Sequence, residues 1–102
     1  MKHAAAGTLA TIEPLLAAIR TLPGLIERRP GIFYLKSRAY LHFHEDPAGI
    51  FADARLSEDF ERFAVNTPRE QAAFFELLAV NRGVPVRDRA RRGVTLGALD
   101  AS

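Results

Sequence analysis

Apolar residues recur at helical spacing in a segment near the start of the chain. They stand three or four positions apart, at Ile12, Leu15, Leu16, Ile19 and Leu22. This spacing places them on one face of an α-helix. Thr11 is the expected N-cap, and Pro14 falls in the first turn, where the missing N–H costs little. Pro23 and Gly24 are expected to end the helix.

A second helix is predicted after residue 67, and its start has the clearest local signal in the chain. Thr67 is the expected cap, Pro68 takes the first helical position, and Glu70 completes a capping box. The apolar residues that follow are Phe74, Phe75, Leu77, Leu78 and Val80. Gly83 stands where a C-terminal stop is expected.

Between the two helices, short runs of β-branched, aromatic and alternating residues predict strands at 32–36, 39–45 and 50–55, and a shorter one at 60–65. Asp46-Pro47-Ala48-Gly49 has the residues of a type I turn. The expected fold is α+β, an antiparallel meander of three to four strands flanked by an N-terminal and a C-terminal helix, in the order α-β-β-β-(β)-α.

The expected organisation is a single domain over residues 11–83. Residues 1–10 are small and are expected to form a loose N-terminus. Residues 84–102 are expected to form a flexible, Arg-rich C-terminal tail.

The register of the predicted strands determines which residues share a face of the sheet. A turn over residues 46–49 places His42 opposite Asp53. A two-residue loop at Ser37-Arg38 then places Phe33 opposite His42. One face would be apolar and take the helices, with Ile32, Tyr34, Leu41, Phe43, Ala52 and Ala54. The second face would mix apolar, aromatic and ionisable groups, at Phe33, Leu35, Tyr40, His42, His44, Phe51, Asp53 and Arg55.

Two kinds of chemistry could use this second face. His42 and His44 would point to the same side, and Asp53 could add a third ligand, which gives the three-ligand set of an open zinc site. His42 with Asp53 could also act as a general base with an orienting carboxylate, or form a plain structural hydrogen bond. The face offers no Ser, Thr or Cys nucleophile, so we name no catalytic residue and expect a binding module rather than an enzyme.

The apolar members of the second face need a cover that two helices on the other face cannot supply. An exposed apolar patch on a small domain usually marks an interface or a ligand groove. We therefore expect a homodimer that buries this face. The alternative is a pocket for a small apolar or aromatic ligand, with Arg55 or His42 binding its polar end.

Composition and charge narrow the function classes further. The chain has 102 residues, 48% hydrophobic and 25% charged, which excludes large catalytic scaffolds and a disordered chain. It has no cysteine, which excludes disulfides and cysteine catalysis and fits a reducing cytoplasm. No apolar run approaches the ~18 residues of a membrane span.

The excess of basic residues lies in the tail. Residues 82–102 hold five arginines against two aspartates, whereas the rest of the chain has nine basic and ten acidic residues. Nucleic-acid binding through Arg87, Arg89, Arg91 and Arg92 is therefore a further alternative, although the tail has no aromatic residue for base stacking.

Several of these segments together resemble a bacterial family known as the luciferase-like small domain. They are Leu-Pro-Gly at 22–24, His-x-His at 42–44, Gly-Ile-x-Ala-Asp at 49–53 and the closing helix, so the resemblance covers about residues 12–81. The chain is also similar to small bacterial domains of the MmcQ/YjbR type. Both resemblances imply a small bacterial α+β protein, and neither implies a catalytic residue or a cofactor. Light emission is not implied, because bacterial luciferase subunits resemble TIM barrels, which need ~250 residues.

Overall fold

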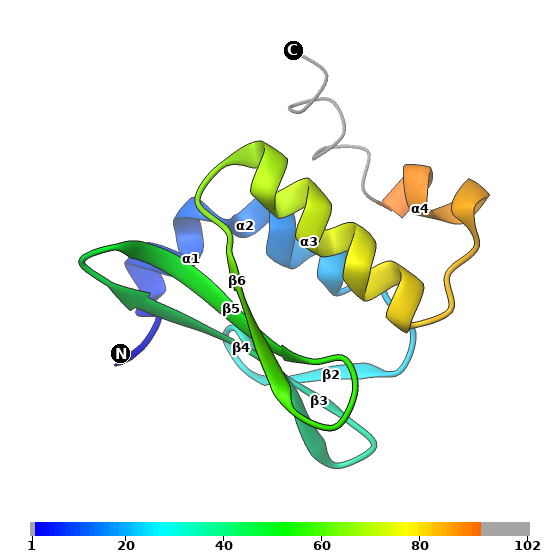
Figure 1. The fold of residues 1–102 in the computed structure, drawn as a ribbon, viewed down its shortest axis with the longest axis horizontal. Helices are drawn as coiled ribbons and strands as arrows, with labels where there is room; N and C mark the ends of the chain where they lie inside the picture. The colour runs from blue at the N-terminus through cyan, green and yellow to red at the C-terminus, as the bar shows by residue number, and fades with distance from the viewer. Residues whose placement is uncertain (1, 93–102) are drawn as a thin grey trace.

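The computed structural model describes residues 2–92 of the chain. Six antiparallel strands form one sheet, in which β2 to β6 lie in sequence order and β1 pairs with β4. Helices α2 and α3 lie side by side on one face of this sheet (Figure 1). The fold is therefore α+β, as predicted. The elements are β1 Lys2–His3, α1 Ala6–Thr11, α2 Glu13–Ile19, β2 Leu25–Arg29, β3 Ile32–Leu35, β4 Arg38–Asp46, β5 Gly49–Arg55, β6 Phe60–Ala64, α3 Pro68–Asn81 and α4 Val86–Arg92.

The hydrophobic core lies between the helices and one face of the sheet. Its largest fully buried side chains come from both layers: Ile12, Leu15, Leu16 and Ile19 near α2, Phe74 and Leu78 from α3, and Phe33, Leu41 and Phe43 from β3 and β4. Phe43 meets Phe74 edge to face, with ring centroids 6.4 Å apart. The other face of the sheet has no helix over it in the described part of the chain.

The pairing of β4 with β5 follows the predicted register. His42 lies opposite Asp53, and His44 lies opposite Phe51. The turn that sets this register is tied by the Asp46 carboxylate, which accepts a hydrogen bond from the Ala48 amide at 2.7 Å. Gly49 closes the turn at φ 134°, a conformation that favours glycine.

The predicted pairing of β3 with β4 is wrong, for two physical reasons. The two-residue loop is Lys36-Ser37 rather than Ser37-Arg38, and both loop residues have the positive φ of a type I′ turn (51° and 69°). The register also shifts after Phe33, which leaves Tyr40 as an extra residue in β4.

A change of register by one residue moves side chains to the opposite face of a sheet. Phe33 therefore lies opposite Leu41 instead of His42, and it is a core residue with 1% of its surface exposed. Tyr40 is also buried on the core side, with 2% exposed. Ile32 lies opposite His42, on the face away from the helices. The prediction that Phe33 and Tyr40 belong to the second face is corrected by this register.

Two of the strands, β1 and β2, are not predicted by the sequence pattern. β2 pairs with β3, although its sequence Leu-Ile-Glu-Arg-Arg has little strand character. Its Glu27 accepts two hydrogen bonds from the Arg20 guanidinium, which lowers the pKa of that carboxyl. β1 lies within residues 1–10 and α1 begins there, where a loose segment was expected. Thr11 is not an N-cap: it ends α1, and Ile12 caps α2.

The second helix begins as predicted. The Thr67 hydroxyl accepts from the Glu70 amide, and the Glu70 carboxylate accepts from the Thr67 amide, which completes the capping box of α3. Gly83 follows the helix with φ 73°. Within the predicted tail, residues 86–92 form α4. Residues 93–102 of that tail lie outside the described residues.

Candidate metal centre

All three histidines of the chain meet on the face of the sheet opposite the helices. His42 and His44 lie two residues apart on β4, so they point to the same side. His3 lies on β1, directly opposite His44. Each ring offers one nitrogen to a group of three that lie within 4.8 Å of one another. His3 was not among the predicted site residues, because residues 1–10 have no strand pattern in the sequence.

The nitrogens of His42 and His44 lie very close together. Nδ1 of His42 is 2.6 Å from Nε2 of His44. Two imidazole lone pairs at this distance repel each other unless a proton or a cation lies between them. Burial lowers the pKa of His42, with a smaller contribution from His44 in the same direction. A lowered pKa favours the neutral ring, which is the form of imidazole that binds metals.

His44 is the most enclosed of the three rings, with 8% of its surface exposed. Its Nε2 lies 3.1 Å from Oδ2 of Asp53 as well as near His42. Its Nδ1 is buried and has no hydrogen-bond partner in the part of the chain that the structure describes. A buried polar atom without a partner is costly, and such atoms often mark a site that takes an ion or a water.

Asp53, which the sequence analysis offered as a metal ligand, is engaged by an arginine. The Arg62 guanidinium donates from Nε to Oδ1 at 2.7 Å and from Nη2 to Oδ2 at 2.8 Å. This two-point pairing lowers the pKa of Asp53, so the carboxylate stays ionised at neutral pH. Asp53 is thus placed to orient the His44 ring. The third histidine, His3, joins His42 and His44 as the candidate metal ligand that Asp53 was predicted to be.

Two contacts hold His3 in position beside β4. The amide of Ala4 donates to the carbonyl of Phe43 at 3.0 Å and continues the pairing of β1 with β4. The Glu45 carboxylate then accepts hydrogen bonds from the Ala5 amide at 2.7 Å and from the Thr8 hydroxyl at 2.6 Å. Both donors lie at the start of α1, so Glu45 ties the start of the chain to the strand that carries His42 and His44.

A recess of about 570 Å³ opens beside the histidines. It is lined by His3, Arg28, Arg29, Ile32, Tyr34, Ala39 and His42. The Arg28 guanidinium lies 4.6 Å above the Tyr34 ring, which places a positive charge at this surface. The lining includes two arginines and no carboxylate, so the recess favours a negatively charged ligand.

The other residues singled out from the sequence do not all belong to this site. Phe51 is half-buried on the same face, opposite His44. Arg55 donates from Nε to the Ala39 carbonyl at 3.1 Å and stacks over the Phe60 ring. Leu35 packs against the core cluster and, with Tyr40, lines a separate pocket described below.

The arginines proposed to bind nucleic acid are described in part. Arg89 donates to the Val84 carbonyl at 2.7 Å and pairs with Glu76 at 2.6 Å, so it is used within the fold. Arg87 is exposed. The side chains of Arg91 and Arg92 lie outside the described residues.

No protein-family model, curated protein or solved structure matches this chain. The resemblance to the luciferase-like small domain and to the MmcQ/YjbR type therefore stays a prediction. None of the helices among the described residues is long and apolar enough to cross a membrane.

Proposed function

We propose that this protein binds a divalent transition metal, with zinc as the first candidate, through His3, His42 and His44. The observation that carries the proposal is the convergence of all three histidines of the chain on one point of the sheet. Imidazole nitrogen is a preferred ligand of zinc, copper and nickel. A structural site normally has four protein ligands, whereas three ligands leave a position for water or for a substrate.

The surroundings of the histidines support this proposal. In metal sites, a ligating histidine usually donates its second N–H to a carboxylate, which orients the ring and increases its basicity. Oδ2 of Asp53 lies 3.1 Å from Nε2 of His44, so Asp53 would take this role with the buried Nδ1 of His44 as the metal ligand, and Arg62 holds Asp53 in turn.

The recess beside His3 and His42 could hold a small anion next to the bound metal. Arg28 and Arg29 supply the positive charge, and Tyr34 and Ile32 supply an apolar wall. A zinc ion at the histidines would polarise a bound oxyanion or lower the pKa of a bound water to about 7. We infer a binding function first, with hydrolysis as the activity to screen once metal binding is established.

Isothermal titration of metal-free protein with ZnCl₂ tests this proposal, using protein without a histidine tag. We expect one zinc per chain. His3→Gln will weaken binding by roughly a hundredfold, and Asp53→Asn by roughly tenfold to a hundredfold, because the carboxylate only orients a ligand. Lys2→Gln is the matched control, since Lys2 lies on the same strand and outside the cluster.

The outcomes of this titration separate the possible roles of His3. Absence of binding in the wild-type protein would end the metal proposal. Binding that survives His3→Gln unchanged would place the metal on other residues. An equal loss in Lys2→Gln would show that the substitutions disturb β1 rather than remove a ligand.

A second candidate function is homodimerisation through the open face of the sheet, in a cytoplasmic binding module. Two apolar side chains favour it: Ile26 is 58% exposed, and Phe60 is 37% exposed next to the His42 ring. We expect light scattering to give the mass of a dimer, and Ile26→Arg to give a folded monomer. Leu77→Arg is the control, because Leu77 is comparably exposed on α3. A wild-type monomer, or a dimer that survives Ile26→Arg, would contradict this candidate.

A further inference from the structure

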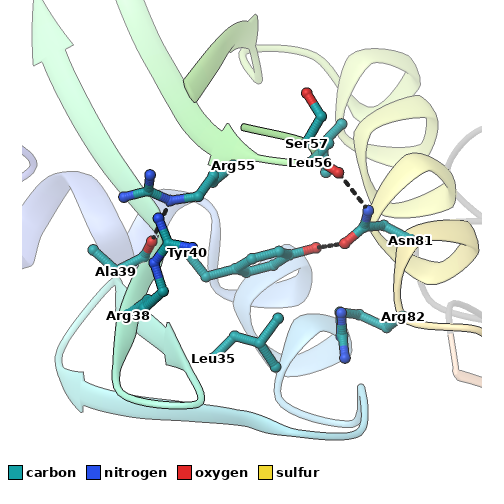
Figure 2. Close-up of a pocket in the computed structure, with 9 residues that line it drawn as sticks. All are labelled: Leu35, Arg38, Ala39, Tyr40, Arg55, Leu56, Ser57, Asn81 and Arg82. Atoms are coloured by element: carbon teal, nitrogen blue, oxygen red, sulfur yellow. Dashed lines mark hydrogen bonds between the residues drawn. The ribbon is translucent and has the colours of Figure 1, made fainter. Parts of the chain in front are cut away.

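A second pocket lies between the β3–β4 hairpin and the end of α3; it shares Ala39 with the recess beside the histidines, but none of the three histidines lines it. Its volume is about 230 Å³. Figure 2 shows the Tyr40 side chain reaching across it toward Asn81, with Leu35 and Arg82 below and Arg55 above and to the left, beside Ala39. The pocket is lined by Leu35, Arg38, Ala39, Tyr40, Arg55, Leu56, Ser57, Asn81 and Arg82.

The charge of this lining is one-sided. Arg38, Arg55 and Arg82 are three of its nine residues, and no carboxylate is among them. Within residues 2–92, none of these three arginines forms an ion pair with a carboxylate, whereas Arg20, Arg62 and Arg89 each do. Glu58 and Asp59 follow Ser57 in the chain but do not line the pocket. Three guanidinium groups that share one cavity without a counter-charge leave a site that favours an anion.

The hydrogen bonds at the pocket leave guanidinium donors available. Arg55 uses Nε on the Ala39 carbonyl and Nη1 on the Glu58 carbonyl. Arg82 donates from Nε to the Pro23 carbonyl at 3.4 Å, and its guanidinium also interacts with the Tyr40 side chain, 5.7 Å from the centre of the ring. A guanidinium has five N–H donors, so both side chains keep donors for a ligand. Arg38 is exposed, and it makes no side-chain hydrogen bond within the described residues.

The back of the pocket is rigid and partly apolar. The Tyr40 hydroxyl donates to Oδ1 of Asn81 at 2.7 Å, and Nδ2 of Asn81 donates to the Leu56 carbonyl at 2.9 Å (Figure 2). These two bonds fix the Tyr40 ring and the end of α3 relative to β5. Leu35 and Leu56 add aliphatic surface beside the ring. The pocket therefore combines a fixed apolar wall with unpaired positive charge.

We propose that this pocket binds a small organic anion, a carboxylate or a phosphate monoester with a compact apolar body. The oxyanion would lie against Arg38, Arg55 and Arg82, since arginine pairs with both groups through two parallel hydrogen bonds. The apolar body would lie against Tyr40, Leu35 and Leu56. This site is separate from the histidine cluster and does not depend on metal.

The test uses metal-free protein labelled with ¹⁵N, in which NMR reports the Nε–H signals of individual arginines. Phenyl phosphate and phenylacetate are the two anionic probes, and benzyl alcohol is the neutral one. We expect at least one anion to shift the signals of Arg55 and Arg82 in a saturable way, with little effect from benzyl alcohol. Tighter binding of phenyl phosphate would assign the site to phosphate monoesters, and tighter binding of phenylacetate would assign it to carboxylates.

Two exposed positions allow the pocket to be changed without touching the core. Arg38→Ala removes one charge at the tip of the hairpin, and we expect it to weaken binding by at least about tenfold, the worth of one charge-assisted hydrogen bond. Ser57→Glu places a carboxylate at the pocket and should weaken binding by at least as much. Arg87→Ala is the control, because it removes the same charge from α4 and should change affinity less than twofold.

Three results would overturn the proposal. The first is the absence of any arginine Nε–H shift with either anion at millimolar concentration. The second is an equal loss of affinity in Arg87→Ala and Arg38→Ala, which would indicate attraction to net charge alone. The third is equal binding of benzyl alcohol and the anions, which would make the pocket an apolar site.

Discussion

Zinc at about a hundred times its Kd will stabilise the metal-free protein by about 2.7 kcal/mol, because it binds the folded chain and not the unfolded one. In a domain of this length, the corresponding rise in melting temperature is on the order of 10 °C. The chain has no cysteine and only three histidines, so the unfolded state offers little competing affinity. Differential scanning calorimetry with and without ZnCl₂, after treatment with a chelator, measures the shift.

The same experiment on variants and at several pH values separates a specific site from general metal adsorption. His42→Ala will abolish the shift, and Lys2→Gln will retain it. The shift will also shrink as the pH falls below about 6.5, because protons compete with the metal for the imidazoles. Burial lowers the pKa of His42, so this ligand keeps its lone pair further into the acid range than a free histidine would. A shift that persists in His42→Ala would contradict the site.

Phe43→Ala will lower the free energy of unfolding by about 3–5 kcal/mol, which is the usual cost of removing a buried phenyl ring and leaving a cavity. Phe43 is 1% exposed, lies opposite Ala52, and packs edge to face on Phe74. Urea denaturation followed by circular dichroism measures the loss.

Leu77→Ala is the matched control for this prediction. Leu77 is 43% exposed on α3, so its truncation should change stability by less than about 1 kcal/mol. A loss in Phe43→Ala no larger than the loss in Leu77→Ala would mean that β4 does not pack against α3 as described. Because Phe43 stands between His42 and His44 but points to the other face, this variant also tests whether metal affinity depends on the core.

The sequence predicts best where a local signal determines the structure. The pairing of His42 with Asp53 depends on one turn, and Asp46 and Gly49 mark that turn unambiguously. The start of α3 depends on Thr67 and Glu70, which bond each other within one helical turn. In both places the residues that form the structure are neighbours in the chain, so their types alone carry the information.

The β3–β4 hairpin shows why a local pattern can fail. Its turn residues, Lys36 and Ser37, rarely adopt positive φ, so nothing in their types indicates a type I′ turn. The sequence gives no sign of the bulge at Tyr40 either, because the bulge depends on how the tyrosine packs in the core and hydrogen-bonds to Asn81. The misplaced loop alone would have kept each side chain on its predicted face, so it is the extra residue at Tyr40 that exchanged the faces of Phe33 and Ile32.

Only two of the three histidines in the candidate site could be predicted from the sequence, for a related reason. His42 and His44 share a strand, so their common direction follows from the alternation of side chains. His3 joins them only through a strand of two residues, and Glu45 holds that strand through Ala5 and Thr8. A contact between residues so far apart in the chain leaves no periodic pattern in the sequence, so it is seen only in the folded structure.

The shortness of β1 has a consequence for how the proposed site would respond to change. His3 and His44 are the two ends of a loop of roughly forty residues. The contacts that hold β1 against β4 determine the effective concentration of His3 near His44. Those contacts involve Glu45 and the start of α1, none of which supplies a ligand. Substitutions at Thr8 or Glu45 would therefore lower metal affinity in proportion to the time that His3 spends away from β4, with the coordination chemistry itself unchanged.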